Sequence, residues 1–238
     1  MNDSTRTIGQ WLLNALKVIG LFALNMLATI LLGVFMPLTA VFGFWGGLIL
    51  FILALIVQIG VAILAWRLYQ RWQSGDNLAK LGGKDFLYGV GFWLVVRLLI
   101  VILNYFMVHF EGIETTPNDA SLQLMLDSTK NIWGSLIFAL MTTVGAPIIE
   151  EIVFRAGFKH LLFKPEQFYA PLLVSSTIFA FFHGPTGIFS FLIYFLLGVA
   201  LYLAYSRRNN IKDSMLVHFI NNGVLVAALI IMHAMNWS

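Results

Sequence analysis

The sequence predicts an all-α protein, a polytopic transmembrane bundle of about seven helices with the amino terminus inside. Composition is the first reason: 60% of the 238 residues are hydrophobic and only 11% are charged, whereas a soluble domain carries about a quarter charged residues. The second reason is that apolar residues form runs of roughly 17 to 25, long enough for helices to cross a hydrocarbon core about 30 Å thick. Barrel strands would be about ten residues long and alternate in polarity, so the runs exclude a transmembrane barrel.

Two polar segments organise the chain between its apolar runs. The Gly-containing inner loop 67–85 is expected to be a flexible link, and it separates a first part, residues 1–85 with two crossings, from a transmembrane core, residues 86–238. The longest outer segment, roughly 111–130, carries four carboxylates and is expected to be a solvated connector or a short surface helix. The crossings are expected at 11–36, 40–66, 86–110, 131–155, 169–186, 188–206 and 214–235.

Several helix boundaries have a local cause. The first crossing follows a polar start that contains Asp3 and Arg6, and no small-residue cleavage site follows it, so we expect a retained helix. In the fourth crossing Pro147 removes one backbone hydrogen bond, which favours a kink. The fifth crossing ends at Gly184-Pro185, a strong helix terminator.

Lysine and arginine are distributed unequally between the two sides of this topology. Eleven lie in segments assigned to the cytoplasmic side and one, Lys130, lies opposite, which places the amino terminus inside. The net charge of +3 therefore reflects topology and anionic lipid headgroups, and the sequence has no basic stripe that would indicate nucleic-acid binding. Cysteine is absent, which removes thiolate nucleophiles and Cys-ligated metal sites. The inner eleven are Arg6, Arg67, Arg71, Lys80, Lys84, Arg155, Lys159, Lys164, Arg207, Arg208 and Lys212.

Glu150 and Glu151 are the two carboxylates that fall inside a stretch otherwise fit for lipid, the run 132–163. A carboxylate at membrane depth costs at least about 2.5 kcal/mol unless it is paired, protonated or facing water, so such residues are functional candidates. Four-residue spacing lets Glu151 and Arg155 form an ion pair on one helical face, while Glu150 lies about 100° round the helix. Glu150 is then the unpaired carboxylate, either a partner for a neighbouring helix or a reactive group.

Three further polar side chains lie in the apolar helices downstream. His183 ends the fifth crossing, and His218 and Asn222, four residues apart, share one face of the seventh. Each could serve only to join helices through hydrogen bonds. Together they fit hydrolysis, with Glu150 as base, His183 sharing the water, and the Asn222 amide and His218 N–H stabilising an oxyanion. Counting along the helices places His183 deeper than the others, so a short, tilted or broken fifth helix is needed.

These residues stand in three ordered motifs, and the chain thereby resembles the CPBP (Abi) intramembrane proteases, which include the CAAX prenyl protease type 2 enzymes. The resemblance covers roughly residues 130–235. It implies an endopeptidase in which Glu150 and His183 activate water and His218 and Asn222 stabilise the oxyanion. Glu151 and Arg155 would then be structural. The motifs are EExxxR at Glu150, Glu151 and Arg155, FxxxH at Phe179 and His183, and HxxxN at His218 and Asn222.

The resemblance leaves the question of a metal open. Such proteases are often described as metalloproteases, yet zinc sites draw on His, Cys and carboxylate ligands in a tetrahedral array, and HExxH is absent here. Glu150, His183 and His218 could provide three ligands if they converge. A metal-free glutamate base needs no such convergence, so no cofactor is favoured and one zinc ion is the alternative.

Arg97 is a second charged residue at membrane depth, about eleven residues into the third crossing. We expect it to line the same cavity or to pair with a carboxylate of the fourth crossing. The alternative is a side chain that reaches thinned lipid or water on its own.

The function expected from these observations is cleavage of a peptide bond near the cytoplasmic face by a multi-pass protein of the plasma membrane. The partners expected are membrane lipid and a peptide or membrane-anchored protein, prenylated if the resemblance extends that far, and no nucleic acid. One alternative is a non-catalytic immunity factor, regulator or scaffold that uses the same polar residues to bind a partner. A proton-coupled transporter is weakened because the sequence has no internal repeat and no second unpaired intramembrane acid.

Overall fold

The computed structural model describes residues 7–129 and 131–235, and Arg6 and Lys130, which enter the charge distribution, lie outside them. Helices are the regular secondary structure throughout these described ranges, which confirms the all-α fold. Six helices in them are long and apolar enough to cross a membrane. The orientation of the bundle stays a prediction.

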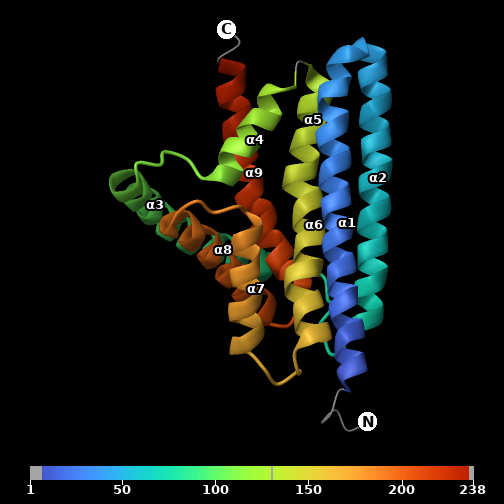
Figure 1. Ribbon diagram of the computed structural model, residues 1–238, viewed down its shortest axis with the longest axis vertical. Coiled ribbons are helices and arrows are strands. Elements are labelled where there is room, and N and C mark those ends of the chain that lie inside the picture. Colours follow the sequence, from blue (N-terminus) through green and yellow to red (C-terminus); the bar gives the residue numbers. More distant parts are fainter. Residues whose placement is uncertain (1–6, 130, 236–238) are drawn as a thin grey trace.

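The helices follow one another as shown in Figure 1, with one π-helical segment at the end of the third crossing and two within the fourth. One surface helix, α4, forms within the outer segment that was expected to be a connector or a short helix. The elements are α1 (Ile8–Val41), α2 (Gly43–Trp72), α3 (Gly83–Phe106), η1 (Met107–Glu111), α4 (Pro117–Asp127), α5 (Ile132–Leu140), η2 (Met141–Gly145), α6 (Ala146–Glu151), η3 (Ile152–Leu162), α7 (Tyr169–Phe182), α8 (Ile188–Ser206) and α9 (Ile211–Met235).

The first two helices form a long hairpin that lies along the fourth crossing (Figure 1). Gly43 makes the reversal at φ +64°, a conformation that side chains other than glycine rarely adopt. Small residues let the helices approach: a Cβ on Gly47 would lie 2.7 Å from the Trp133 ring, and one on Gly134 would lie 2.9 Å from the Thr39 hydroxyl. The hairpin therefore supplies one wall of the bundle.

The fourth crossing accommodates Pro147 by changing its hydrogen-bond register. The Ala146 N–H donates to the Met141 carbonyl, five residues back, as in a π-helix. The next bond in that register would run from residue 147 to the Thr142 carbonyl, and proline has no N–H to donate. Thr142 is thus left with a free backbone carbonyl. The crossing continues to Leu162, seven residues beyond its predicted end.

The fifth predicted crossing, 169–186, is shorter than expected. Helix α7 has 14 residues, about 21 Å at 1.5 Å per residue, which is less than the hydrocarbon thickness. It ends at His183 and Gly184, the latter at φ +63°, about midway along the long axis of the molecule (Figure 1). His183 still lies fourteen residues after Tyr169, yet it lines one cavity with the other motif residues Glu150, His218 and Asn222.

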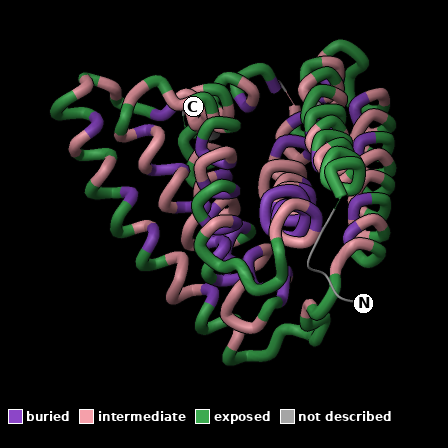
Figure 2. The backbone as a smooth tube through the Cα atoms, turned by 60° about the horizontal axis from the view of Figure 1, so that its bottom comes forward, coloured by how far each residue is buried: buried purple, intermediate pink, exposed green. Residues whose placement is uncertain are grey.

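Buried residues concentrate in α6 and η3, where the fourth crossing meets its neighbours, whereas the outer faces of α1, α2 and α3 are exposed (Figure 2). The exposed side chains on those outer faces are largely apolar, as contact with lipid requires. Some charged and amide side chains, among them Asn25, Glu151, Arg155 and Asn221, are instead buried inside the bundle. The fold therefore encloses a polar interior in an apolar shell.

Candidate active site

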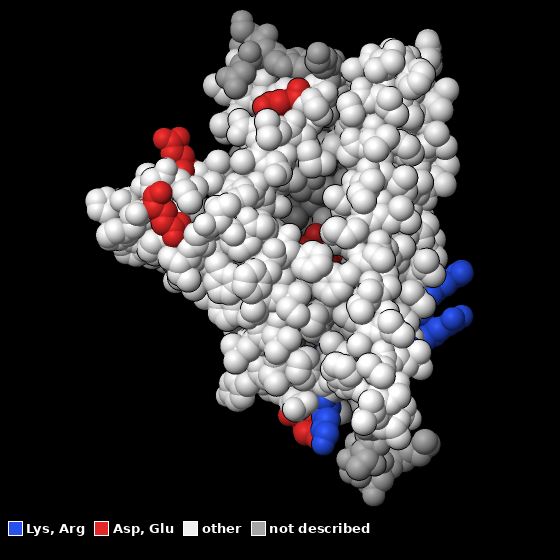
Figure 3. Space-filling view, viewed as in Figure 1, with Lys and Arg blue, Asp and Glu red and all other residues white. Residues whose placement is uncertain are grey.

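A cavity of about 350 Å³ lies between the α1–α2–α6 side of the bundle and the α3–α4–α8–α9 side. Figure 3 shows a hollow at mid-height in this face, with atoms of an acidic residue inside it, far from either end of the long axis. The catalytic candidates from sequence and the cavity candidate all line it. They are Glu150, His183, His218, Asn222 and Arg97.

The two adjacent glutamates point in different directions, as their places on the helix require. Arg155 Nε lies 3.1 Å from Glu151 Oε2, and both side chains are fully buried. The rings of Phe179 and Phe154 cover the guanidinium, with centroids 4.8 and 5.9 Å from its Cζ. Glu150, on the next face of the helix, is 17% exposed and opens into the cavity. The ion pair is thus sealed in protein while its neighbour faces the hollow.

His218 joins the two carboxylates, a link that sequence analysis missed. Its Nδ1 lies 2.8 Å from Glu151 Oε1, and its Nε2 lies 3.8 Å from Glu150 Oε2. A carboxylate paired with an always-charged arginine only accepts hydrogen bonds, so Nδ1 carries a proton. The charges of Glu151 and Arg155 cancel. With Nδ1 of His218 protonated, the whole cluster is neutral when one further proton is bound, either by Glu150 or by Nε2 of His218. A neutral cluster avoids the cost of an isolated buried charge.

His183 is fixed in one tautomer by its own helix. Its Nδ1 lies 2.7 Å from the Phe179 carbonyl, which only accepts, so the neutral ring presents a bare Nε2. The ring stacks on Tyr194 with centroids 4.3 Å apart and planes 17° from parallel. Tyr194 in turn hydrogen-bonds Thr116 at 2.7 Å and donates to Asp119 at 3.2 Å. Helices α4 and α8 thus hold the imidazole in place, which the FxxxH motif alone does not reveal.

Asn222 is oriented by the carbonyl that Pro147 leaves free. Its Nδ2 donates to the Thr142 carbonyl at 3.0 Å, and its Oδ1 accepts from Asn221 Nδ2 at 3.2 Å. One N–H of the carboxamide remains for a ligand in the cavity. The proline in the fourth crossing and the asparagine in the last are therefore parts of one arrangement.

The three possible metal ligands of the sequence analysis share one cavity. Glu150, His183 and His218 all line it. Within residues 7–129 and 131–235, no group of three or more His, Cys, Asp or Glu side chains is arranged to hold a metal ion. The expectation of no cofactor, with one zinc ion as the alternative, stays a prediction.

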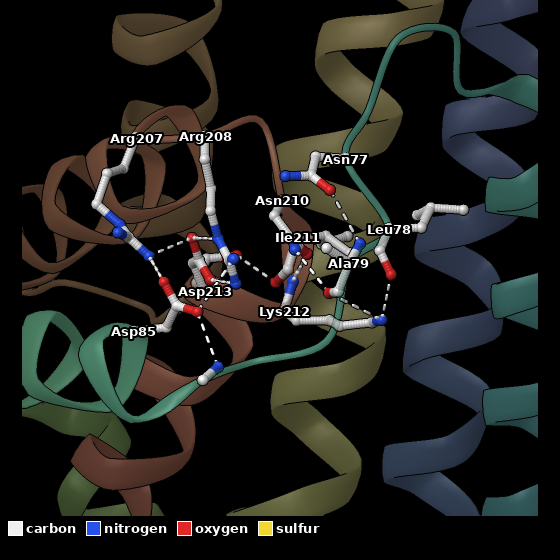
Figure 4. A network of polar contacts seen from close by, with 12 residues as sticks. Asn77, Leu78, Ala79, Asp85, Arg207, Arg208, Asn210, Ile211, Lys212 and Asp213 are labelled. Carbon is white, nitrogen blue, oxygen red and sulfur yellow. Dashed lines mark hydrogen bonds and ion pairs between the residues drawn. The ribbon is translucent and has the colours of Figure 1, made fainter.

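Ion pairs fasten the start of α9 below this site (Figure 4). Arg208 Nε and Arg207 contact the Asp213 carboxylate at 2.8 and 3.0 Å, and both arginines also contact Asp85 of α3. Asp213 lies five residues before His218 in the same helix. The network therefore sets the position of the helix that carries two of the candidate catalytic residues.

A second polar centre lies at the same end, around Asp76 of the inner loop. Tyr205 and Tyr69 donate to its two oxygens at 2.7 and 2.8 Å, and His160 Nε2 lies 2.9 Å away. Burial would raise the pKa of Asp76, but the hydrogen bonds and the charge of His160 outweigh it, and this pKa lies below its ordinary value. The loop that was expected to be flexible is thus tied to α2, η3 and α8.

Comparison with known proteins matches part of the chain. Residues 131–224 match the family described as Type II CAAX prenyl endopeptidase Rce1-like. UPF0177 protein YvdC of Lactococcus lactis subsp. lactis (strain IL1403) is 28% identical over 163 residues, which cover 66% of this chain and 60% of the relative. The chain thus spans less than two thirds of that relative's length. No solved structure matches the chain.

The matched segment contains all three motifs and the helices α5 to α9 up to Val224. It supports an intramembrane CAAX-type protease activity at the level of the family. With its six apolar helices, the chain is an integral multi-pass membrane protein. The resemblance to the CPBP intramembrane proteases is therefore confirmed, through the Rce1-like segment that residues 131–224 form.

Proposed function

We propose that this protein is an intramembrane endopeptidase that hydrolyses a peptide bond of a membrane-associated protein or peptide with a water activated by Glu150. One observation carries the proposal: Glu150, His183, His218 and Asn222, from three helices, line a single cavity at the level of the bilayer. Ionisable groups collected in a hollow within a membrane domain are functional by default, because lipid offers them no partners.

In the proposed reaction, Glu150 and His183 hold the attacking water. The Glu150 carboxylate accepts one proton of the water, and the bare Nε2 of His183 accepts a hydrogen bond from the other. The water oxygen bonds to the scissile carbonyl carbon, and the carbonyl oxygen becomes an oxyanion. Glu150 then gives its proton to the amine as the C–N bond breaks, which leaves a carboxylic acid and an amine.

The oxyanion would be stabilised from α9. Asn222 has one N–H free after its bond to Thr142, and His218 donates from Nε2 when it holds the proton shared with Glu150. Glu151 is a positioning residue in this scheme, because its hydrogen bond to Nδ1 turns the Nε2 edge of His218 toward the cavity. Arg155, 3.1 Å from the other oxygen of Glu151, holds that carboxylate in place for the task.

The remaining parts of the proposal concern cofactor, substrate and location. No metal is required, because a carboxylate base and two N–H donors supply the same functions. The substrate class is a lipid-embedded or membrane-anchored peptide, and the family match favours a prenylated one. The plasma membrane is the proposed location.

Cleavage by the purified protein tests the proposal. We expect wild-type protein in lipid nanodiscs to cleave members of a library of membrane-associated peptides, prenylated ones included, with or without a chelator present. Glu150→Gln and His183→Ala should each lower the rate by about 10²-fold or more. Glu166→Gln, which changes an exposed loop glutamate, is the matched control and should leave the rate unchanged. Full activity in a folded Glu150→Gln variant would contradict the proposal.

A further inference from the structure

A groove of about 820 Å³ lies on the surface between α3 and α8, outside the candidate active site. The two helices lie side by side (Figure 1), and the residues that line the groove differ from those that line the cavity described above. The groove faces lipid, since side chains such as those of Leu87 and Val95 are exposed. Helical spacing gives each wall an apolar stripe, with Leu87, Gly91 and Val95 on α3 and Leu196, Ala200 and Leu203 on α8.

A glycine keeps the groove open at membrane depth. A Cβ on Gly91 would meet no atom within 4 Å, whereas one on Gly89, two residues earlier, would lie 2.9 Å from the Leu216 side chain of α9. Gly89 therefore serves the packing of two helices, and Gly91 does not. Because protein interiors and their lipid surroundings leave few empty spaces, the space beside Gly91 needs an occupant from the bilayer.

The groove is long enough for one acyl chain of a membrane lipid. Its α3 wall runs from Lys84 to Leu99, fifteen residues, which is about 22 Å at 1.5 Å per residue. A chain of one leaflet spans about 15 Å, half of the hydrocarbon core, so it fits within the groove even if the helices are tilted. A peptide would find almost no hydrogen-bond partners on these apolar walls, which favours a lipid.

One end of the groove carries a positive charge without a protein counter-charge. In residues 7–129 and 131–235, no carboxylate oxygen lies within 4 Å of the Lys84 ammonium group, and no hydrogen bond engages it. The adjacent carboxylate of Asp85 is already paired with Arg207 and Arg208 (Figure 4). Lys84 belongs to the loop that is predicted to lie on the cytoplasmic side, where the leaflet carries anionic lipids that attract lysine.

We infer that this groove binds an anionic phospholipid, with its phosphate at Lys84 and one acyl chain along Gly91 and Ala200. Tyr88, one turn after Lys84, lines the same end, and its ring lies under the Arg207 guanidinium with 4.4 Å between Cζ and the ring centroid. Its hydroxyl makes no hydrogen bond to another described residue, so it can donate to the phosphate. The site contains no candidate catalytic residue, so it is independent of the endopeptidase proposal.

Photo-cross-linking tests the site directly. The probes are phosphatidylglycerol and phosphatidylcholine that carry the same acyl chains, with a diazirine in one of them. Each is added in turn, at a low molar fraction, to phosphatidylcholine nanodiscs that contain the full-length protein, and mass spectrometry maps the labelled residues. We expect the phosphatidylglycerol probe to label segments 87–99 and 196–203 about fivefold more than the phosphatidylcholine probe, which is the effect of about one lysine on an anionic headgroup.

Variants separate the contribution of the headgroup from that of the chain. Lys84→Gln should make the two probes label the groove equally, whereas Arg71→Gln, an exposed position on α2, should keep the fivefold preference. Gly91→Leu places a side chain in open space, so the protein should fold while groove labelling by both probes falls about fivefold or more, because the chain loses its buried surface. Gly60→Leu, an equally open glycine on α2, is the matched control and should change neither result.

Several outcomes would overturn the inference. They include labelling spread evenly over the lipid-facing helices, equal groove labelling by the two probes in the wild type, and groove labelling that is undiminished in a folded Gly91→Leu variant. If a diazirine-bearing fatty acid labels the groove more strongly than phosphatidylglycerol, the occupant is a fatty acid and the phospholipid inference is wrong. If the wild type is dimeric in nanodiscs and Gly91→Leu alone makes it monomeric, the groove is an interface between two copies of the chain.

Discussion

The buried ion pair beside the cavity offers a quantitative test of how the site is held. At the observed 3.1 Å between Arg155 Nε and Glu151 Oε2, Coulomb attraction in a medium of effective dielectric constant about 20 is about 5 kcal/mol. Removing one partner also strands the other charge in a fully buried place, and such changes cost about 3–5 kcal/mol. Glu151→Gln and Arg155→Met should each lower the free energy of unfolding by that amount.

The double variant is the informative one. With both charges gone, no ion is left unpaired, so the combined cost should be about 2–3 kcal/mol smaller than the two single costs added together. Unfolding of the purified protein in mixed micelles, followed by far-UV circular dichroism, measures all three. Arg71→Met, on the exposed face of α2, is the control and should change stability by no more than about 0.5 kcal/mol. Strictly additive single costs would refute the view that these two side chains form one buried unit.

Two smaller predictions follow from the backbone of the fourth crossing and from the inner loop. Pro147→Ala restores an N–H that can donate to the Thr142 carbonyl, so the helix should gain stability. Cleavage should slow, because Asn222 then loses the carbonyl that orients it. Raised stability with an unchanged cleavage rate would contradict the role given to that carbonyl. Because the pKa of Asp76 in the folded protein lies below its ordinary 3.8, its ionisation contributes stability above about pH 4, and this is lost as the pH falls through the lowered pKa. Unfolding free energies measured from pH 6 to 3 should therefore fall more steeply for wild type than for Asp76→Asn, and parallel curves would contradict this.

The helices were largely predictable because lipid imposes a simple rule on sequence. A crossing must be long, apolar and helical, and hydropathy alone located six of these spans to within a few residues at most boundaries. The exceptions have local physical causes. The fourth crossing runs on to Leu162 as a π-helix that tolerates Arg155 because it is paired with Glu151, and Lys159 because it donates to Asn209. Helix α7 ends early because Gly184-Pro185 stops it halfway.

The grouping of the site was only partly predictable. Spacing of four residues gave the Glu151–Arg155 contact directly, because both lie on one helix. The contact between Glu151 and His218 spans 67 residues and depends on how two helices cross, which no local pattern encodes. The stacking of Tyr194 on His183 escaped notice for the same reason.

Backbone groups are the other part that sequence reasoning missed. The Thr142 carbonyl acts on Asn222 only because η2 adopts the π register in front of Pro147. The sequence feature that indicates this free carbonyl is a proline, Pro147, five residues after Thr142. It can be interpreted only when the helix is known to have π-helical hydrogen bonds at this point. Side-chain motifs therefore indicate the reacting groups, while the groups that orient them emerge from packing.

An experimental structure of the Glu150→Gln protein with an uncleaved peptide bound would test the central claim most directly. The account predicts a scissile carbonyl oxygen about 2.7–3.1 Å from both Asn222 Nδ2 and His218 Nε2, with a water between the carbonyl carbon and the side chains at positions 150 and 183. A peptide bound elsewhere on the protein, or one whose backbone passes the cavity with its carbonyl groups turned away from α9, would contradict it.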